Sequence, residues 1–441
     1  MATAGEIEAA HLLRRTGFGA STADVAVLAP MTRAQRVDWV MDFSGNTPAI
    51  HPPYVMNAND PTQVDSYASF IVMRRWWLDR MATVARPFHE KMTLFWHGHL
   101  TTSFWKVGDI ESIMDQNDTF RANAFGSFNT LVQLVSLGSA MIQYLDNDSN
   151  YAGHPNENFA RELMELFTLG VDNGYVQADV LAMARAWTGH NLQYPQSGGP
   201  PVYHFYSGNH DTGLKSIFGL PAQNWDGPPL LAQLINGVRK AQCALHIARR
   251  LWTFLAGPPT VDLTPFANAF AADNMNISTL VRSILLSDAF YTDQVRHSLV
   301  RPPIDWGVSL LRATGRDCTQ TDMDYHLSDL GQGVLEPPTV AGWKINNIWI
   351  SENAEWEKSD GATRVADQAV TAGFLSGLET TPVATAVDIA LDALGTPAWS
   401  VSAGTKTALA NFLSAERAVN GTRQRRNIIR LISLSPEFQL A

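Results

Sequence analysis

The sequence predicts an all-α protein, because helical periodicity recurs along most of the chain and strand patterns are rare. Val180, Met183, Ala184 and Trp187 follow the i, i+3, i+4, i+7 spacing of an amphipathic helix. Comparable patterns span residues 67–83, 87–97, 119–137, 229–255, 280–290, 361–378, 402–415 and 428–432. The strand candidates are residues 202–206 and 347–351, each short enough to form one arm of a hairpin. We therefore expect a multi-helix globular fold with at most a small β-hairpin.

Composition and charge exclude some classes of function. The 441 residues are 45% hydrophobic and 17% charged, which is enough apolar material for a sizeable core. The chain carries 32 Lys and Arg against 42 Asp and Glu, a formal charge of −10. Nucleic acids and anionic membranes attract basic surfaces, so we expect neither as a partner. Residues 14–19, RRTGFG, lack the spacing and terminal Lys-Ser/Thr of a P-loop, and we expect no nucleotide cofactor.

The cysteines, the apolar runs and the first residues of the chain give information on the cellular location of the protein. Cys243 and Cys318 favour two unpaired buried thiols, with a single bridge as the alternative. No apolar run approaches the roughly 20 residues of a membrane span. The first 20 residues lack a charged segment followed by an apolar stretch, so no signal peptide is visible. The location is therefore unknown: either the cytoplasm, or an exported protein whose leader has been removed.

Three long segments without periodicity interrupt the helices. They are residues 44–66, 190–228 and 332–360. Loops of this length are uncommon in compact proteins and are often functional. The last two contain clustered aromatic and polar residues, so we expect them to cover a central cleft.

The segment RPFHEKMTLFWHGHLTTS, residues 86–103, contains a candidate metal-binding pair. In a continuous helix His97 and His99 would point about 200° apart. They could bind one ion only if the helix ended near Gly98 and His99 turned back. Neutral imidazole suits Zn, Fe, Cu or Ni, so we consider a divalent metal there. The alternative is that His97 is buried beside Trp96 and hydrogen-bonded to a backbone group.

The segment NENFARELMELFTLG, residues 156–170, predicts a helix with a polar face. That face carries Glu157, Asn158, Arg161, Glu162, Glu165 and Thr168. In one interpretation it is solvated, and Arg161 forms i,i+4 pairs with its neighbouring glutamates. In the other it lines a cleft, where Arg161 orients a carboxylate and Glu162 or Glu165 acts as a ligand or general base.

Two loop motifs could reach such a cleft. His210, Asp211 and Lys215 lie close together in residues 190–228, where they could contact substrate, complete a metal shell or form a surface turn. Trp343 follows GQGVLEPPTVAG and, with Trp349, could stack on a sugar ring or anchor the loop to the protein body.

These segments together resemble the DUF1800 family, whose function is unassigned. The matching stretches are HLLRRTGFGAS, RPFHEKMTLFWHGHLTTS, YLDNDSNYAGHPNENFARELMELFTLG, DVLAMARAWTG, HDTGLKSIFG and GQGVLEPPTVAGW. The resemblance covers almost the whole chain and implies one helical unit over residues 1–441. A possible subdivision is 1–190, a linking loop at 191–228, and 229–441. Gly98 stands where relatives often carry Asn, and His190 where they often show Trp.

The resemblance also implies that the polar residues of these motifs recur together, which favours a functional site. It implies roles for Trp96, His97, His99, Asn156, Glu157, Asn158, Arg161, Glu162, Glu165, His210, Asp211, Lys215, Gln332 and Trp343. Relatives often neighbour DUF1501 proteins, so the resemblance further implies a DUF1501-type partner in an envelope pathway.

From these residues we expect a hydrolase. Either a metal on His97, His99 and a carboxylate activates water, or a Glu pair acts as acid and base on a glycosidic bond. The expected catalytic residues are Glu157, Arg161, Glu162 and Glu165; the expected substrate contacts are Trp96, Asn158, His210, Asp211, Lys215 and Trp343. The substrate would be a carbohydrate or another envelope-related molecule. The alternatives are a non-enzymatic partner-binding protein with a buried polar network, and a redox metalloprotein with iron or copper on the His pair.

Overall fold

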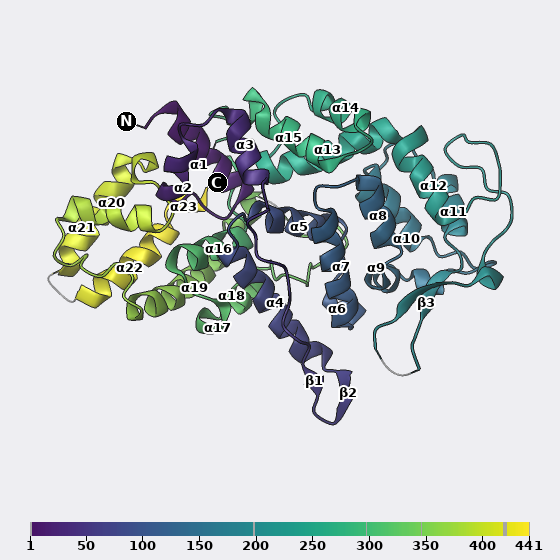
Figure 1. The fold of residues 1–441 in the computed structure, drawn as a ribbon, viewed down its shortest axis with the longest axis horizontal. Helices are drawn as coiled ribbons and strands as arrows, with labels where there is room; N and C mark the ends of the chain where they lie inside the picture. The colour runs from purple at the N-terminus through teal and green to yellow at the C-terminus, as the bar shows by residue number, and fades with distance from the viewer. Residues whose placement is uncertain (1, 197–198, 297, 345, 418–420, 441) are drawn as a thin grey trace.

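The computed structural model describes residues 2–196, 199–296, 298–344, 346–417 and 421–440, and it confirms the mainly helical prediction. Helices form an elongated body in which the N-terminal helices α1–α3 lie at the upper left (Figure 1). The C-terminal helices α20–α22 form one end of this body, and α8–α12 lie towards the other.

The first half of the chain contributes helices α1 to α11. Their bounds are α1 (Ala4–Thr16), α2 (Thr22–Leu28), α3 (Arg33–Met41), α4 (Ser66–Thr83), α5 (Phe88–His99), α6 (Phe104–Val107), α7 (Ile110–Asn123), α8 (Phe128–Ser136), α9 (Ser139–Tyr144), α10 (Glu157–Glu162) and α11 (Gln177–Ala186). Helix starts follow local chemistry: Thr3 and Glu6 form a reciprocal capping box on α1.

The second half contributes α12 to α23. Their bounds are α12 (Gly227–Gln233), α13 (Lys240–Ala256), α14 (Thr264–Ala272), α15 (Ile277–Leu286), α16 (Pro303–Thr314), α17 (Cys318–Thr321), α18 (Met323–Asp329), α19 (Glu352–Thr371), α20 (Val383–Ala393), α21 (Ala403–Arg417), α22 (Gly421–Ser433) and α23 (Pro436–Gln439). Two π-helical segments, η2 (Leu163–Thr168) and η4 (Leu234–Val238), directly follow α10 and α12.

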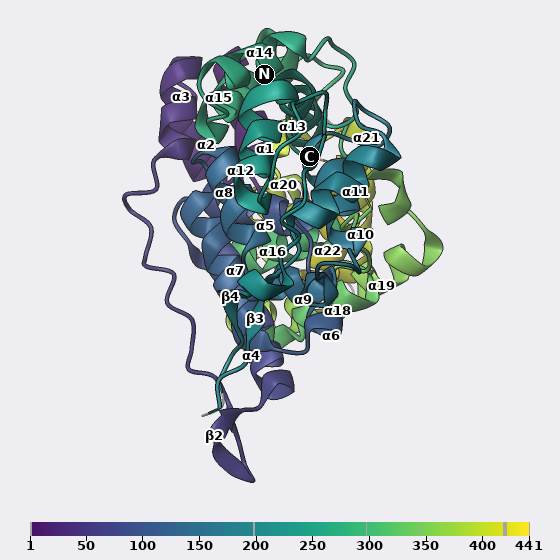
Figure 2. The same ribbon diagram turned by 90° about the vertical axis from the view of Figure 1, so that its right-hand side faces the viewer.

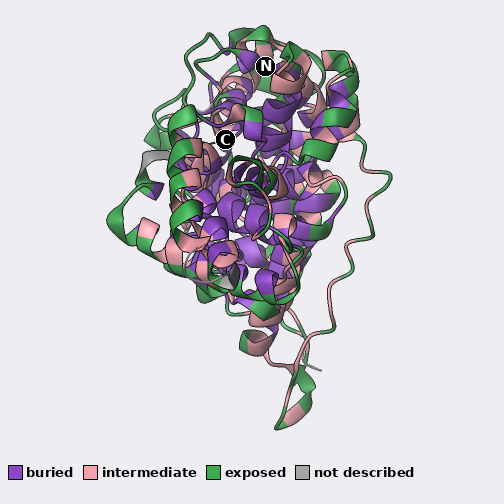
Figure 3. Cartoon of the chain, turned by 90° about the vertical axis from the view of Figure 1, so that its left-hand side faces the viewer, coloured by how far each residue is buried: buried purple, intermediate pink, exposed green. Residues whose placement is uncertain are grey.

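The strands among the described residues form two antiparallel hairpins, whereas the sequence predicted at most one. They are β1 (Met56–Asn57) with β2 (Asp60–Val64), and β3 (His190–Gln193) with β4 (Val202–Phe205). The chain after α3 runs extended along the outside of the body to the β1–β2 hairpin, which projects from it (Figure 2). That hairpin is exposed or half-buried, whereas buried residues concentrate among the inner helices (Figure 3).

The strand prediction at residues 347–351 is wrong. The chain forms a 3₁₀ turn, η6 (Asn346–Trp349), and α19 begins at Glu352, so the predicted loop at 332–360 ends nine residues early. Ser351 caps α19 by accepting a hydrogen bond from the N–H of Ala354, 3.2 Å away. The Lys358 ammonium donates to the carbonyl of Trp349 at 3.0 Å, which ties the turn to the helix.

The core is apolar but contains buried charges. Five tryptophans are fully buried: Trp77, Trp96, Trp187, Trp252 and Trp306. Glu90, with no exposed surface, accepts hydrogen bonds from Arg80 at 2.6 Å and Arg121 at 3.0 Å. Cys243 and Cys318 are both free and buried, as the sequence predicted. Because each of these charges has a partner, the core tolerates them.

Candidate metal centre

His97 and His99 do not share an ion-binding position, because α5 continues through both residues. Nε2 of His97 accepts a hydrogen bond from the N–H of Leu335 at 3.2 Å. Nε2 of His99 instead donates to the carbonyl of Phe167 at 3.0 Å. Trp96 directly precedes His97 in sequence, is fully buried, and donates through Nε1 to the carbonyl of Ala124 at 3.0 Å. These three residues therefore connect α5 to neighbouring segments.

The π-helical segment η2 explains the position of His99. In η2 the backbone bonds reach five residues back, as from the N–H of Leu169 to the carbonyl of Met164 at 2.9 Å. The carbonyls of Phe167 and Leu166 accept hydrogen bonds from His99 and His246, both at 3.0 Å. Burial lowers the pKa of His246 to about 4 and that of His99 well below its usual value. Both imidazoles are therefore neutral donors that cap the end of this helix.

The polar face of α10 is partly exposed to solvent and forms the i,i+4 ion pairs that the first of the two alternatives predicted. Arg161 contacts Glu157 at 2.9 Å and Glu165 at 3.3 Å, and all three side chains are partly exposed. Gln177 closes the cluster by donating to Glu157 at 2.7 Å. Burial, and then the charge of Glu165, raises the pKa of Glu162. Arg161, the expected orienting group, is thus already engaged by two carboxylates.

The asparagines at the start of α10 hold the preceding turn. Asn156 caps the helix by accepting from the N–H of Asn158 at 3.0 Å, and it donates to the carbonyl of Asp146 at 3.1 Å. Asn158 donates to the carbonyl of Leu145 at 3.3 Å. These contacts account for both side chains without a substrate.

Asp211 and Lys215 secure the long loop between β4 and α12. Asp211 receives two hydrogen bonds from the guanidinium of Arg185, at 2.6 and 3.1 Å. Lys215 is almost fully buried, and its ammonium donates to the carbonyls of Asp211 and Gly213 and to the side chain of Asn224. Both side chains therefore support the loop, and a contact of Asp211 or Lys215 with substrate stays a prediction.

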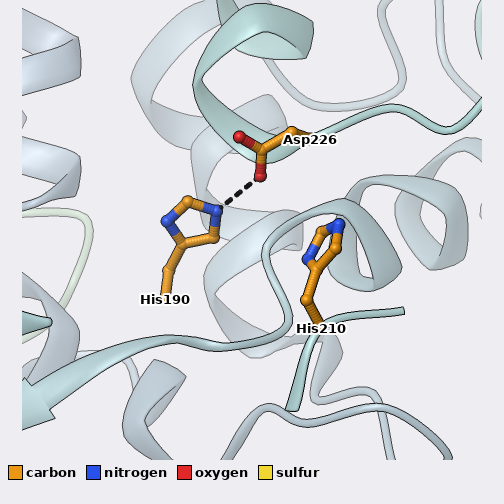
Figure 4. Close-up of side chains that lie close together, drawn as sticks. All are labelled: His190, His210 and Asp226. Atoms are coloured by element: carbon orange, nitrogen blue, oxygen red, sulfur yellow. Dashed lines mark hydrogen bonds and ion pairs between the residues drawn. The ribbon is translucent and has the colours of Figure 1, made fainter. Parts of the chain in front are cut away.

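The same loop brings three potential metal ligands together. One ligand atom from each of His190, His210 and Asp226 lies within 4.8 Å of the others. His190 begins β3, His210 follows β4, and Asp226 caps the N-terminus of α12 through the N–H of Gly227 at 2.9 Å. In Figure 4 the Asp226 carboxylate faces the His190 ring across a hydrogen bond, and the His210 ring stands beside them.

Hydrogen bonds to the second ring nitrogens orient both histidines. Nδ1 of His210 lies 2.8 Å from the carbonyl of Thr188, which can only accept, so Nδ1 carries a proton and Nε2 has a lone pair whenever the ring is neutral. Nδ1 of His190 lies 2.9 Å from the hydroxyl of Tyr203, and Nε2 lies 2.8 Å from Asp226. Because a hydroxyl can donate or accept, Tyr203 permits either tautomer of His190.

The electrostatics favour an ionised carboxylate at Asp226. Burial alone would raise its pKa, but the hydrogen bond and charge of His190, the N–H of Gly227 and the charge of His210 together lower it. The side chain of Asp226 is 45% exposed, whereas that of His190 is 3% exposed. An ion could therefore reach the centre from the Asp226 side.

The backbone conformation at Gly189 also allows the two histidines to come together. Gly189 precedes His190 with φ +80°, and a Cβ there would lie 2.7 Å from the carbonyl oxygen of Tyr206 and 3.2 Å from the N–H of His210. Asn147 supports β3 from the other side by donating to the carbonyl of His190 at 2.7 Å. Glycine is thus needed for the close approach of the segments that carry His190 and His210.

A second cluster, His326, Glu357 and Asp360, has a less suitable geometry. Glu357 approaches Nδ1 of His326 at 3.5 Å, whereas Asp360 approaches Nε2, on the opposite side of the ring, at 3.9 Å. Arg364 also contacts Asp360 at 3.9 Å. Both carboxylates lie farther from the His326 ring than Asp226 lies from His190, at 2.8 Å, and Asp360 also has a cationic neighbour, so we favour the His190 cluster.

The sequence identified one of the three clustered residues. His210 was expected to contact substrate or complete a metal shell, whereas His190 was noted only as a departure from the family and Asp226 was not singled out. The Asp-Gly-Pro-Pro run at residues 226–229 is a helix-start signal that could have placed Asp226 at an N-terminus. His190 joins the cluster through the pairing of β3 with β4, and no local spacing reveals this pairing.

Comparisons with known proteins identify a family and no activity. The sequence model described as "Protein of unknown function (DUF1800)" matches residues 11–440. No curated protein and no solved structure matches the chain. Within the described residues, none of the helices combines the length and hydropathy needed to cross a bilayer.

Proposed function

The chain belongs to the DUF1800 family, which supplies no reaction, and from its own residues we propose that it is a metal-assisted hydrolase centred on His190, His210 and Asp226. The observation that carries the proposal is the convergence of two imidazoles and one carboxylate, each oriented by a further hydrogen bond. Catalytic zinc sites commonly use two histidines and a carboxylate and leave one position open. A divalent ion held there would supply an activated water molecule.

The hydrogen bonds around the ligands are compatible with a loaded site. With its Nδ1 proton donated to the carbonyl of Thr188, a neutral His210 keeps a lone pair on Nε2 that an ion could use. His190 would move its proton to Nδ1 and donate it to the oxygen of Tyr203, while the Tyr203 hydroxyl turns away. Oδ1 of Asp226 caps α12 and accepts from His190, so Oδ2 remains available to an ion.

The surroundings support a sugar-containing substrate. The aromatic side chains Tyr194, Tyr203, Phe205 and Tyr206 are all exposed on or beside the β3–β4 hairpin. Exposed aromatic rings stack on flat apolar surfaces, which sugar rings provide. A cavity of about 210 Å³ lined by Tyr203, Val202 and Asp115 adjoins the same hairpin. Substrate bound in this cavity would be separated from His190 by the side chain of Tyr203.

The test measures bound metal and hydrolysis together. Untagged protein dialysed against Zn²⁺ should retain about one ion per chain by plasma mass spectrometry. His210→Gln and Asp226→Asn should each weaken the affinity at least tenfold. Asn preserves the helix cap, so the second change isolates the loss of the carboxylate. His204→Gln is the matched control, because His204 is an exposed histidine of the same hairpin.

Activity is then measured with chromogenic esters, phosphodiesters and glycosides. Hydrolysis that requires added Zn²⁺ and is lost in Asp226→Asn supports the proposal. Wild-type protein that retains no metal, or retains as much in the Asp226→Asn variant, contradicts the metal centre.

A redox function is the second candidate, since two histidines and a carboxylate also hold iron in non-haem oxygenases. Anaerobic loading with Fe²⁺ separates the two proposals. Preference for Fe²⁺ over Zn²⁺, with oxygen consumption and no hydrolysis, would favour the redox enzyme.

A further inference from the structure

A second site lies between α5, α13 and the segment that carries Trp343. A cavity of about 320 Å³ is lined there by Phe95, Phe254 and Trp343, together with Arg249, Arg250 and Lys344. The volume is at the lower end of the range for small-molecule pockets. The lining combines aromatic rings with cations, which suits a ligand with an apolar body and a negative charge.

Close contacts hold Trp343 against α5. A Cβ at Gly98 would lie 3.1 Å from Cε3 of Trp343, so the ring packs directly on the glycine. The Trp343 ring also meets the His97 ring edge to face, with centroids 5.3 Å apart. Gln332, which lines the same cavity, accepts from the N–H of Ile304 at 2.9 Å. The aromatic wall of the cavity is therefore preformed.

The cations of this cavity lack anionic partners in the part of the chain that the structure describes. Among the described residues, Arg249, Arg250 and Lys344 have no ion pair or hydrogen bond from their side chains. The cavity also contains Asp305, but its carboxylate is paired with the buried Lys91 at 2.5 Å. The wall thus carries an uncompensated positive charge.

Arg250 is the most informative of the three cations. It is half-buried, whereas Arg249 and Lys344 are exposed. Burial lowers the pKa of Arg250, and no carboxylate offsets this effect. A half-buried guanidinium without a partner loses part of its hydration, which destabilises the folded protein. Such a cost is typical of binding residues, which are retained for their ligand and not for stability.

We propose that this cavity binds a small carboxylate with a planar or apolar body. Arg250 contacts the carboxylate, Arg249 adds a second cation at the mouth, and Trp343 and Phe254 cover the body. Guanidinium groups match carboxylates through two parallel hydrogen bonds. The site is independent of the metal centre and involves different residues.

The test uses four carboxylates and their neutral amides: benzoate, 2-naphthoate, indole-3-acetate and cyclohexanecarboxylate. Protein is labelled with 5-fluorotryptophan, and the Trp343 signal is assigned in the ¹⁹F spectrum with a Trp343→Phe variant. At least one carboxylate should shift this signal and bind at least tenfold more tightly than its amide. Equal affinity of acids and amides, or no response to any acid, overturns the proposal.

Two variants separate binding from folding. Arg250→Gln should weaken carboxylate binding at least tenfold and leave the melting temperature unchanged or higher. Arg426→Gln, at an exposed ion pair with Asp367, is the control and should leave binding unchanged. Retained binding by Arg250→Gln, or a melting temperature that falls without any change in affinity, contradicts the assignment.

Discussion

The N–H of Leu335 donates a hydrogen bond to Nε2 of His97 across 238 positions of sequence, at 3.2 Å. This bond places the histidine proton on Nδ1 and joins the segment before Trp343 to α5. Burial lowers the pKa of His97 to about 3, so the ring is neutral in the folded protein. A neutral buried histidine makes stability depend on pH.

Acidification should therefore destabilise the protein. The unfolded chain protonates His97 below pH about 6.5, whereas the folded chain does so only near pH 3. The unfolded state binds more protons between these values, so stability falls as the pH falls through this window. His97→Gln keeps an acceptor for Leu335 and should reduce the loss of unfolding free energy between pH 7 and pH 5 by about 2 kcal/mol. Urea unfolding measures this loss; the exposed His154→Gln is the control and should match wild type.

Glu90→Gln should be strongly destabilising. Burial alone would raise the pKa of Glu90, but Arg121 and Arg80 hold it below the usual range. The stabilisation by ionised Glu90 is present above the pKa that this carboxyl has in the unfolded chain. It is lost as the pH falls through the lower pKa of the folded protein. Removing the charge leaves the buried guanidinium of Arg80 without a carboxylate and leaves Arg121 with Asp118 alone, at a cost of about 3–5 kcal/mol at pH 7. Arg161→Ala breaks two partly exposed pairs and should cost less than about 1 kcal/mol. Equal losses of unfolding free energy for Glu90→Gln and Arg161→Ala, measured by chemical unfolding, would refute this distinction between buried and exposed ion pairs.

Gly342→Ala should disrupt the docking of the Trp343 segment. Gly342 has φ +80°, and a Cβ would overlap the carbonyl oxygen of Gly98. Gly108→Ala is the matched control, because Gly108 has φ +73° and open space around it. The control should cost about 1–2 kcal/mol for the backbone conformation alone. Thermal unfolding should show a clearly larger loss for Gly342→Ala, and equal losses would show that the segment can move aside.

Lys215→Met should loosen the loop that carries two of the proposed ligands. Its ammonium donates to the carbonyls of Asp211 and Gly213, and these acceptors would lose a buried donor. Each unsatisfied group costs about 1–3 kcal/mol. Hydrogen exchange should accelerate over residues 208–226, and metal affinity should fall although no ligand has changed. Lys106→Met, at an exposed ion pair, should leave this exchange unaltered.

The helices could be predicted from sequence because their periodicity is local, as in residues 180–186 of α11. Gly98 indicates a nearby helix end, and α5 ends one residue later, at His99. The sequence did not show that Trp343 packs where a side chain at position 98 would stand. The proposed ligands could not be assembled in the same way. His190 and His210 meet through strand pairing, and Asp226 through the return of a loop held by Lys215. These are long-range contacts that no spacing of residues encodes. The division of the chain at residues 190 and 229 stays a prediction.

The π-helical turn η2 makes the number of residues in this helix as important as their identity. An α-helix turns about 100° per residue, and removing one residue from η2 would let the chain return to α-helical bonding. The carbonyls of Leu166 and Phe167, which now accept from His246 and His99, would then rotate away from both rings. Conservative substitutions within 163–168 preserve this alignment, whereas a single deletion removes both contacts at once. Evolution of this segment is therefore constrained in length before it is constrained in composition.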